Sequence, residues 1–230
     1  MSARLGNPRL HHRVTDSTSS VARALASAGA PHGTLVTAGE QRAGRGRHGR
    51  RWSAPAGRAL LMSLVLREWP PHVPIAGAVA VADVAGAAAA IKWPNDVLLD
   101  DRKLAGVLGE SRPQEGWAVL GIGVNVAVRV QDLPAELHDR AATLGLAPAA
   151  IEPTLEALLR ALEQRLAQPT GELLDELRGR DALRGRRVRW AEGEGVACGI
   201  DDSGRLLVQR PGGRDPVALV AGEVHLLGDA

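Results

Sequence analysis

The chain has 230 residues, enough for one large domain and a small one, with 45% hydrophobic and 23% charged residues. This is the composition of an ordinary soluble globular protein. The formal net charge of +2 excludes a chain that binds polyanions through its overall charge, although basic residues cluster locally. Cys198 is the only cysteine. No internal disulfide can form, which fits a reducing compartment, and we expect a cytoplasmic protein.

No segment of the sequence predicts insertion into a membrane. The N-terminal region has no apolar signal core, because His11, His12 and Arg13 interrupt it. Residues 75–91 are apolar and rich in alanine, but Asp83 interrupts them and they fall short of the ~20 apolar residues of a membrane span. We predict a buried helix there and no membrane partner.

The first half of the chain alternates short apolar runs with helical patterns. Asp16 and Ser17 are suitable N-caps for a helix over 18–28, which Gly29 and Pro31 close. Strands are predicted over 9–14, 34–38 and 59–66, a Gly/Arg loop over 40–56, and a long Ala/Val helix from Pro74.

A hairpin is predicted next, from two strand-like pieces at 91–93 and 97–99 and a strand over 103–110 after the Asp100-Asp101 turn. A strand over 117–126 and helices over 154–167 and 172–183 follow.

The pattern changes near Arg180. From Arg186 onward, short β segments with glycine turns cover residues 188–191, 195–200, 206–209, 217–220 and 224–227. We therefore predict an α+β domain over 1–180, a mixed sheet flanked by helices, and a small β-barrel domain over 181–230. Cys198 lies in this second region, where we expect it to be a small core residue rather than a nucleophile.

The motif GRGRHGRRW at residues 44–52 alternates glycine with arginine. Glycines let a backbone approach a ligand and expose its N–H groups, and arginines add permanently charged donors for carboxylate or phosphate. The alternatives are a solvated basic loop or an RNA-binding arginine-glycine segment, although a single occurrence disfavours a repetitive tract.

Two further motifs each contain one of the two lysines of the sequence. In KWPND at 92–96, Lys92 can meet an anionic oxygen and Asp96 can hold Mg²⁺, or simply cap a turn. In KLAGVLGE at 103–110, strict alternation places Lys103 with Ala105 and Val107 on one strand face. The alternative is a lysine that extends to water. Gly106 either leaves room for a ligand or marks a bulge.

The last motif is GIGVN at 121–125, where alternate glycines clear one face of a strand that ends at Asn125. In this order, the four motifs closely resemble the catalytic domain of biotin protein ligases over roughly residues 14–125. The resemblance implies a biotin/lipoate ligase-like domain followed by a small SH3-like β-barrel. Because the biotin motif begins at Asp16, we expect the form without an N-terminal DNA-binding domain, and no DNA partner.

The resemblance implies a role in biotin binding for several residues. Ser17, Thr18 and Ser19 would hold the ureido ring, with Gln41 on its other side, and Ser19 replaces the usual asparagine. Closure over biotin and the acyl phosphate would involve Arg45, Gly46 and Arg47. His48 stands where the family often has arginine, so we expect that charge to be weakened or to depend on pH.

The resemblance also implies ATP, Mg²⁺ and a protein acceptor. Trp52 would pack against the base or else belong to the core, and Asn95 and Asn125 would contact the nucleotide. Lys92 and Lys103 would join Arg45 and Arg47 in stabilising charge at the α-phosphate, and Asp96 would lie near the metal. The implied product is biotin attached to a lysine of a biotin carboxyl carrier domain of a biotin-dependent carboxylase. A homodimer is one state that the resemblance allows.

Three alternatives remain at this point. A lipoate ligase shares the adenylate chemistry but has different motifs. A biotin-sensing repressor would need a DNA-binding surface other than the usual N-terminal one. An RNA-binding module that uses the Gly/Arg loop would bind RNA without ATP and in a salt-sensitive way.

Overall fold

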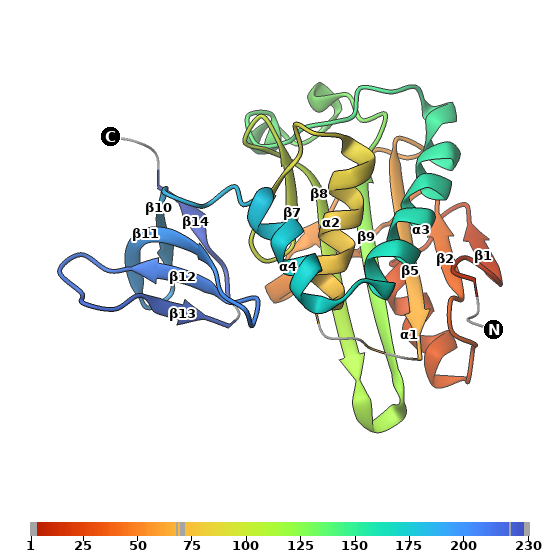
Figure 1. The fold of residues 1–230 in the computed structure, drawn as a ribbon. Coiled ribbons are helices and arrows are strands. Elements are labelled where there is room, and N and C mark those ends of the chain that lie inside the picture. The colour runs from red at the N-terminus through yellow and green to blue at the C-terminus, as the bar shows by residue number, and fades with distance from the viewer. Residues whose placement is uncertain (1–3, 68, 70–71, 221, 228–230) are drawn as a thin grey trace.

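A seven-stranded mixed sheet frames the first part of the chain in the computed structural model, which describes residues 4–67, 69, 72–220 and 222–227 (Figure 1). The strands lie in the order β1-β2-β5-β9-β8-β7-β6. They are β1 (Arg9–His12), β2 (Leu35–Ala38), β5 (Ala59–Leu66), β9 (Trp117–Asn125), β8 (Arg102–Arg112), β7 (Asp96–Leu99) and β6 (Ala90–Lys92). β1 and β2 run parallel, and the other neighbours pair antiparallel.

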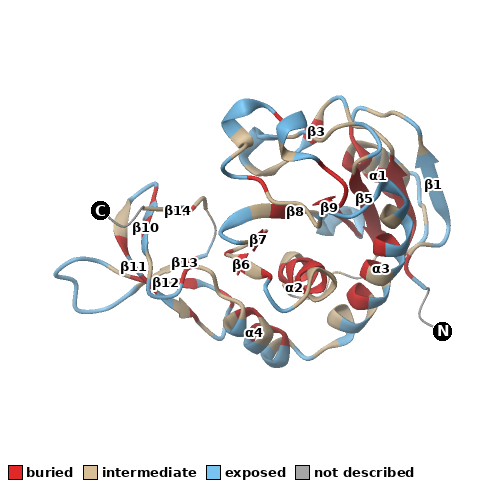
Figure 2. Cartoon of the chain, turned by 90° about the horizontal axis from the view of Figure 1, so that it is seen from above, coloured by how far each residue is buried: buried red, intermediate tan, exposed pale blue. Residues whose placement is uncertain are grey.

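Helices cover both faces of this sheet. α1 (Thr18–Ser27) packs on β2, β5 and β9, and α2 (Val73–Ala85) packs on β8 and β9 from the other side. α3 (Ile151–Ala167) and α4 (Thr170–Gly179) lie beside α2. Figure 2 shows these three helices along one side of the sheet and α1, with the loop that carries β3, along the other. The site described below lies on the α1 side.

The core between α2 and the sheet is built from small side chains because the chain has no Phe or Tyr. α2 is apolar almost all round, as expected for a helix buried between a sheet and other helices. A Cβ at Gly77 would lie 2.9 Å from Val107 Cγ1, so this glycine lets the helix approach the strand closely. Among the described residues, no helix is both long and apolar enough to cross a bilayer.

The second part is a five-stranded antiparallel sheet in the order β13-β12-β11-β10-β14. Its strands are β10 (Arg187–Trp190), β11 (Gly193–Ile200), β12 (Leu206–Gln209), β13 (Val217–Leu219) and β14 (His225–Leu226). The α+β class and the small C-terminal β domain are confirmed, while the division between residues 180 and 181 stays a prediction. Cys198 is exposed, not in the core as predicted, because burial alternates along β11 and Ala197 takes the inner position.

Several predicted bounds differ from the structure for local reasons. The stretch predicted as a loop over 40–56 contains the two-stranded hairpin β3 (Gly44–Arg45) and β4 (Arg51–Trp52), joined through the 3-10 turn Arg47–Gly49. α4 ends at Gly179 rather than at 183, because the backbone of Arg180 and Ala182 hydrogen-bonds to Ile91 of β6. The remaining 3-10 turns are Pro113–Glu115, Val130–Asp132, Ala135–Leu137 and Pro148–Ala150.

Hydrogen bonds join the two parts of the chain, and buried apolar residues of both parts belong to one core cluster. Trp93 of the Pro94 corner is buried, and its Nε1 donates to the Gly204 carbonyl at 2.9 Å. Arg178 of α4 donates to the Ile200 carbonyl at 2.9 Å. These contacts bring the end of the C-terminal domain to the mouth of the cavity described next.

Candidate active site

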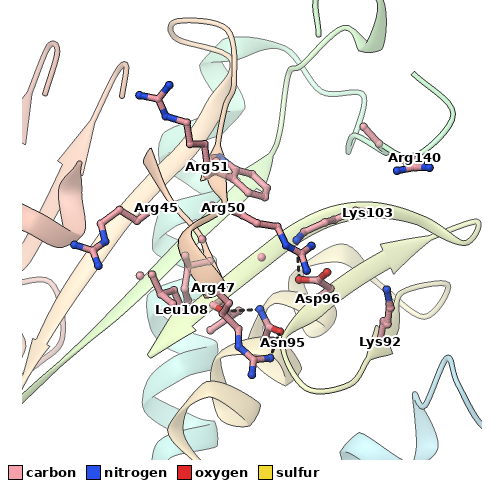
Figure 3. A pocket seen from close by; sticks show the side chains of 18 of the residues that line it. Arg45, Arg47, Arg50, Arg51, Lys92, Asn95, Asp96, Lys103, Leu108 and Arg140 are labelled. Carbon is pink, nitrogen blue, oxygen red and sulfur yellow. Dashed lines mark hydrogen bonds and ion pairs between the residues drawn. The ribbon is translucent and has the colours of Figure 1, made fainter. Parts of the chain in front are cut away.

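A cavity of about 740 Å³ lies on β8 and β9, beneath the β3–β4 hairpin and beside the Pro94 corner (Figure 3). Its size is typical of a small-molecule site. Residues 133–141 and residues 222–226 of the C-terminal domain complete its wall. Of the residues singled out in the sequence, those that line it are Thr18, Ser19, Gln41, Arg45, Gly46, Arg47, His48, Trp52, Lys92, Asn95, Asp96, Lys103, Gly106 and Asn125.

One end of the cavity is neutral and rich in hydroxyl groups. It is formed where α1 begins, by Thr18 and Ser19, with Gln41 opposite. The Thr18 N–H and hydroxyl both donate to Gln41 Oε1, at 2.7 and 3.0 Å. Ser17 differs from its predicted partners, since it is the N-cap residue and does not line the cavity. Its buried Oγ has no hydrogen-bond partner among the described residues.

The middle of the cavity is a glycine-lined groove that the Trp52 ring covers. Gly106 and Gly123 face each other across β8 and β9. A Cβ at Gly123 would lie 2.6 Å from the indole, and one at Gly106 would lie 3.3 Å from it. Alternate glycines therefore make room for Trp52, while the ring's buried Nε1 has no partner among the described residues.

Lys103 lies on the cavity face, but not through the strand alternation predicted from the sequence. The pairing of β7 with β8 shifts register between Val97 and Leu98, so a bulge interrupts the alternation just after Lys103. The lysine consequently lies over Gly106, within 3.3 Å of a Cβ placed there, whereas Val107 faces α2. The predicted grouping of Lys103 with Ala105 and Val107 is thus wrong.

The other end of the cavity carries several cations around one carboxylate. Lys103 Nζ pairs with Asp96 Oδ1 at 2.7 Å, and Arg47 donates to Asn95 Oδ1 at 2.9 Å. Asn95 is itself fixed, because its Nδ2 donates to the Val107 carbonyl at 2.8 Å. Burial lowers the pKa of Lys92, and the neighbouring Lys103 lowers it further, while Asp96 opposes the shift. Lys92 and Lys103 are the only lysines in the sequence.

Arginines of the hairpin make ion pairs that the sequence alone did not suggest. Arg45 points away from the cation cluster in Figure 3 and pairs with Glu110 of β8 at 3.1 Å. Arg50 pairs with Glu223 of the C-terminal domain, which also contacts His225 Nε2 at 3.0 Å. Partial burial and the positive charge of Lys92 lower the pKa of His225. Glu223 therefore lies among cations at the cavity mouth.

Comparison with known proteins now identifies the family. A model described as the biotin/lipoate A/B protein ligase family matches residues 11–126, and one described as the biotin protein ligase C-terminal domain matches residues 185–227. The biotin–[acetyl-CoA-carboxylase] ligase of Mycobacterium tuberculosis is 35% identical over 237 residues, covering 92% of this chain and 86% of that protein. The chain belongs to the biotin protein ligase family.

Other members of the family resemble the chain over most of its length. The biotin–[acetyl-CoA-carboxylase] ligase of Paracoccus denitrificans is 35% identical, over 88% of this chain and 95% of that protein. The bifunctional ligase/repressor BirA of Bacillus subtilis is 35% identical, over 89% of this chain and 70% of that protein. The biotin protein ligase of Aquifex aeolicus, solved with biotin and ATP, superimposes with a TM-score of 0.82 at 25% identity, covering 97% of this chain and all of that one.

Two residues of this biotin protein ligase family member have structural contacts that bear on their predicted roles. Asn125 donates through Nδ2 to the Ala142 carbonyl at 2.9 Å, so it holds the following loop against the cavity. Asp96 offers one carboxylate, and the described residues contain no group of three His, Cys, Asp or Glu side chains able to hold a metal ion. This donor set fits Mg²⁺ only if phosphate oxygens supply most of its ligands.

Among the polar residues around this cavity that were not assigned from the sequence are four with buried or ion-paired side chains. Glu110 lies in the motif KLAGVLGE, in which only Lys103 was given a role. Glu223 and His225 lie in the C-terminal domain, where no motif indicated a binding residue. Ser63, the fourth, is the only polar side chain in the run ALLMSLVL of β5. A lone hydroxyl in an otherwise apolar buried strand is a signal that could have identified it.

Proposed function

We propose that the protein is an ATP-dependent biotin protein ligase. It forms biotinyl-5′-AMP from biotin and ATP, and then transfers biotin to a lysine of a biotin carboxyl carrier domain, releasing AMP. The observation that carries the proposal is a single cavity with a neutral hydroxyl end at Thr18 and Ser19 and a cationic end at Arg47, Lys92 and Lys103. Biotin has two ends that complement these, an uncharged ureido ring and an anionic carboxylate.

The register of the strands supports an orientation of biotin along the groove. Gly121 is opposite Leu108 and lies next to Ser19, whereas Gly123 lies next to Trp52 and is opposite Gly106, which both Trp52 and Lys103 cover. At about 3.4 Å per residue, the two glycines are about 7 Å apart along β9. A ligand that lies along these strands would therefore run from the hydroxyl end, past the Trp52 ring, toward the lysines.

In the first step, a carboxylate oxygen of biotin attacks the α-phosphorus of ATP and expels pyrophosphate. Two anions must meet, so the reaction needs positive charge that is already in place. Lys103 and Lys92, with Arg47 beside them, would neutralise oxygens that gain charge in the transition state. Mg²⁺ would enter with the phosphates of ATP, near Asp96, and neutralise charge on the leaving pyrophosphate.

In the second step, the amine of a carrier lysine attacks the acyl carbonyl of the adenylate. The bond from that carbonyl to the phosphate oxygen breaks, AMP leaves, and the amine gives up its proton to form an amide. No cysteine or serine of the protein needs to bond covalently with the acyl group. Cys198 is exposed on β11 and does not line the cavity. Catalysis would thus rest on positioning and electrostatics.

The test is to incubate the protein with ATP, biotin and a biotin carboxyl carrier domain, and to measure the mass of the carrier. We expect the gain of one biotinyl group, and none on a carrier whose target lysine is replaced by arginine. ATP–pyrophosphate exchange driven by biotin but not by lipoate would distinguish this ligase from a lipoate ligase. Unmodified carrier, together with exchange that needs lipoate, would reject the proposal.

A further inference from the structure

Ser63 of β5 lies directly behind the hydroxyl end of the cavity. Its side chain is fully buried, at 0% exposure, and does not line the cavity itself. Its Oγ lies 2.8 Å from Thr18 Oγ1 and 3.1 Å from Ser19 Oγ. Each of these three hydroxyl groups has a single proton to donate. The donor and the acceptor of each hydrogen bond among them can therefore be assigned.

The direction is set at Gln41. The backbone N–H of Thr18 can only donate, so the Gln41 atom that faces it at 2.7 Å must be the oxygen Oε1. The Thr18 hydroxyl then also donates to this oxygen, at 3.0 Å. Because its only proton is used there, Thr18 must accept from Ser63. By the same reasoning, Ser63 must accept from Ser19.

The consequence is that no hydroxyl proton of Thr18 or Ser19 points into the cavity. Both residues line it, and both retain unused lone pairs that can only accept hydrogen bonds. A ligand that offers N–H groups to these two hydroxyl groups would be bound, whereas one that presents only oxygen or sulfur to them would meet lone pairs with no proton between them. Leaving such buried groups unpaired is strongly unfavourable.

Gly121 leaves the space that the Ser19 hydroxyl needs in this arrangement. A Cβ at position 121 would lie 2.7 Å from Ser19 Oγ and 3.5 Å from Ser63 Oγ. Any side chain at this position would therefore push the Ser19 hydroxyl away from Ser63 and free its proton. The first glycine of the GIGVN motif thus makes room for the Ser19 hydroxyl, whereas the second makes room for Trp52.

We propose that Ser63 is a positioning residue that makes this end of the cavity selective for ligands with N–H donors. It does so by accepting the proton of Ser19 and by donating its own to Thr18. This inference rests on the proposed function, in which the ligand is biotin. The ureido ring of biotin carries two N–H groups, while the dithiolane ring of lipoate carries none, so Ser63 would contribute to the choice between these acids.

The test compares binding of biotin with binding of two isomeric carbamate analogues, in which one ureido N–H or the other is replaced by oxygen. In the wild-type protein, we expect calorimetry to show the isomer with its oxygen at Ser19 binding roughly ten- to a hundred-fold more weakly than biotin. In Ser63→Ala, the Ser19 proton is free to turn toward the ligand. We expect biotin to bind roughly tenfold more weakly and the preference for biotin over that isomer to fall to about threefold.

Controls separate this effect from damage to the fold. Ser63→Cys keeps the shape of the side chain with only weak hydrogen bonding and should shift the preference in the same direction. Thr37→Val removes another buried hydroxyl, from the neighbouring strand β2, where it contacts Arg9 and His11 outside the cavity lining. This control should leave the biotin preference unchanged.

Two outcomes would overturn the inference. One is an unchanged preference for biotin in a folded Ser63→Ala or Ser63→Cys protein, and the other is an equal change in Thr37→Val. Either result leaves the proposed ligase activity intact. By contrast, a wild-type protein that binds no biotin and labels no carrier would reject the proposed function itself.

Discussion

The two ends of the cavity are built in opposite ways. Thr18, Ser19 and Ser63 are buried, belong to α1 and β5, and bond mainly to one another and to Gln41. At the other end, Lys103 and Arg47 are only partly buried, and each already has a partner in Asp96 or Asn95. The neutral end is organised before any ligand binds. Under the proposed function, the cationic end must exchange these internal partners for substrate, so substitutions there should change binding.

The largest effect should come from Lys103, if the cationic end supplies the chemistry. We expect Lys103→Gln to slow adenylate formation by roughly a hundred- to thousand-fold, because a charge that meets the transition state is lost. Single-turnover kinetics would measure adenylate formation and transfer to the carrier separately. Arg102→Gln, an exposed neighbour on β8, is the matched control. Adenylate formation at the wild-type rate would show that Lys103 has no role in this step.

The next effect concerns retention of the intermediate at the same end. Arg47→Gly should release biotinyl-5′-AMP roughly ten- to a hundred-fold faster, through loss of a charge-assisted hydrogen bond. Released adenylate would label lysines of an added bystander protein, which mass spectrometry detects. Arg42→Gly is the control, because Arg42 is exposed and does not line the cavity. Normal retention in Arg47→Gly would mean that other groups hold the phosphate.

A smaller effect should follow from freeing Arg50 of the hairpin. Glu223 pairs with Arg50 and so competes with any phosphate that approaches. We expect Glu223→Gln to lower the KM for ATP by up to about fivefold, since a partly exposed pair is worth roughly 0–1 kcal/mol. The KM for biotin should stay constant, which would sharpen the contrast between the ends. Glu194→Gln in the same domain is the control, and a raised KM for ATP would show that Glu223 supports binding instead.

The smallest effect should come from the junction behind the cationic end. Burial raises the pKa of Asp181, whose Oδ2 is buried and has no partner among the described residues. The folded state therefore favours the protonated acid, and this stability is lost as pH rises through the raised pKa. Asp181→Asn should raise Tm slightly at neutral pH, and the gain should vanish below about pH 4. A lower Tm at neutral pH would contradict this reading.

The sequence predicted most elements and most of the cavity lining because both depend on local signals. Apolar runs predicted β5 and β9, and the four motifs identified the residues that converge on the cavity. The strand face predicted for Lys103 was wrong, because a bulge interrupts the alternation. The sequence KLAGVLGE contains no signal for that bulge. Bulges arise from pairing with a neighbouring strand, which one strand's own sequence does not encode.

Long-range contacts were the other information that the sequence could not supply. Ser63 and Thr18 are far apart in the chain, and only the packing of α1 on β5 joins them. Glu223 reaches Arg50 because the C-terminal domain closes one side of the cavity. Ser17 resembles a binding residue by its motif, yet the start of α1 turns it away from the lining. In each case, the sequence shows the residue type but not which groups its side chain contacts in the fold.

Because lysine occurs only at the two cavity positions, few side-chain amines of the protein itself can be acylated. An activated acyl phosphate reacts with a neutral ε-amine, while a guanidinium stays protonated and inert as a nucleophile. Every basic side chain outside positions 92 and 103 is arginine or histidine. An adenylate that escapes would therefore meet an exterior without side-chain amines, so an enzyme of this kind is shielded from labelling itself.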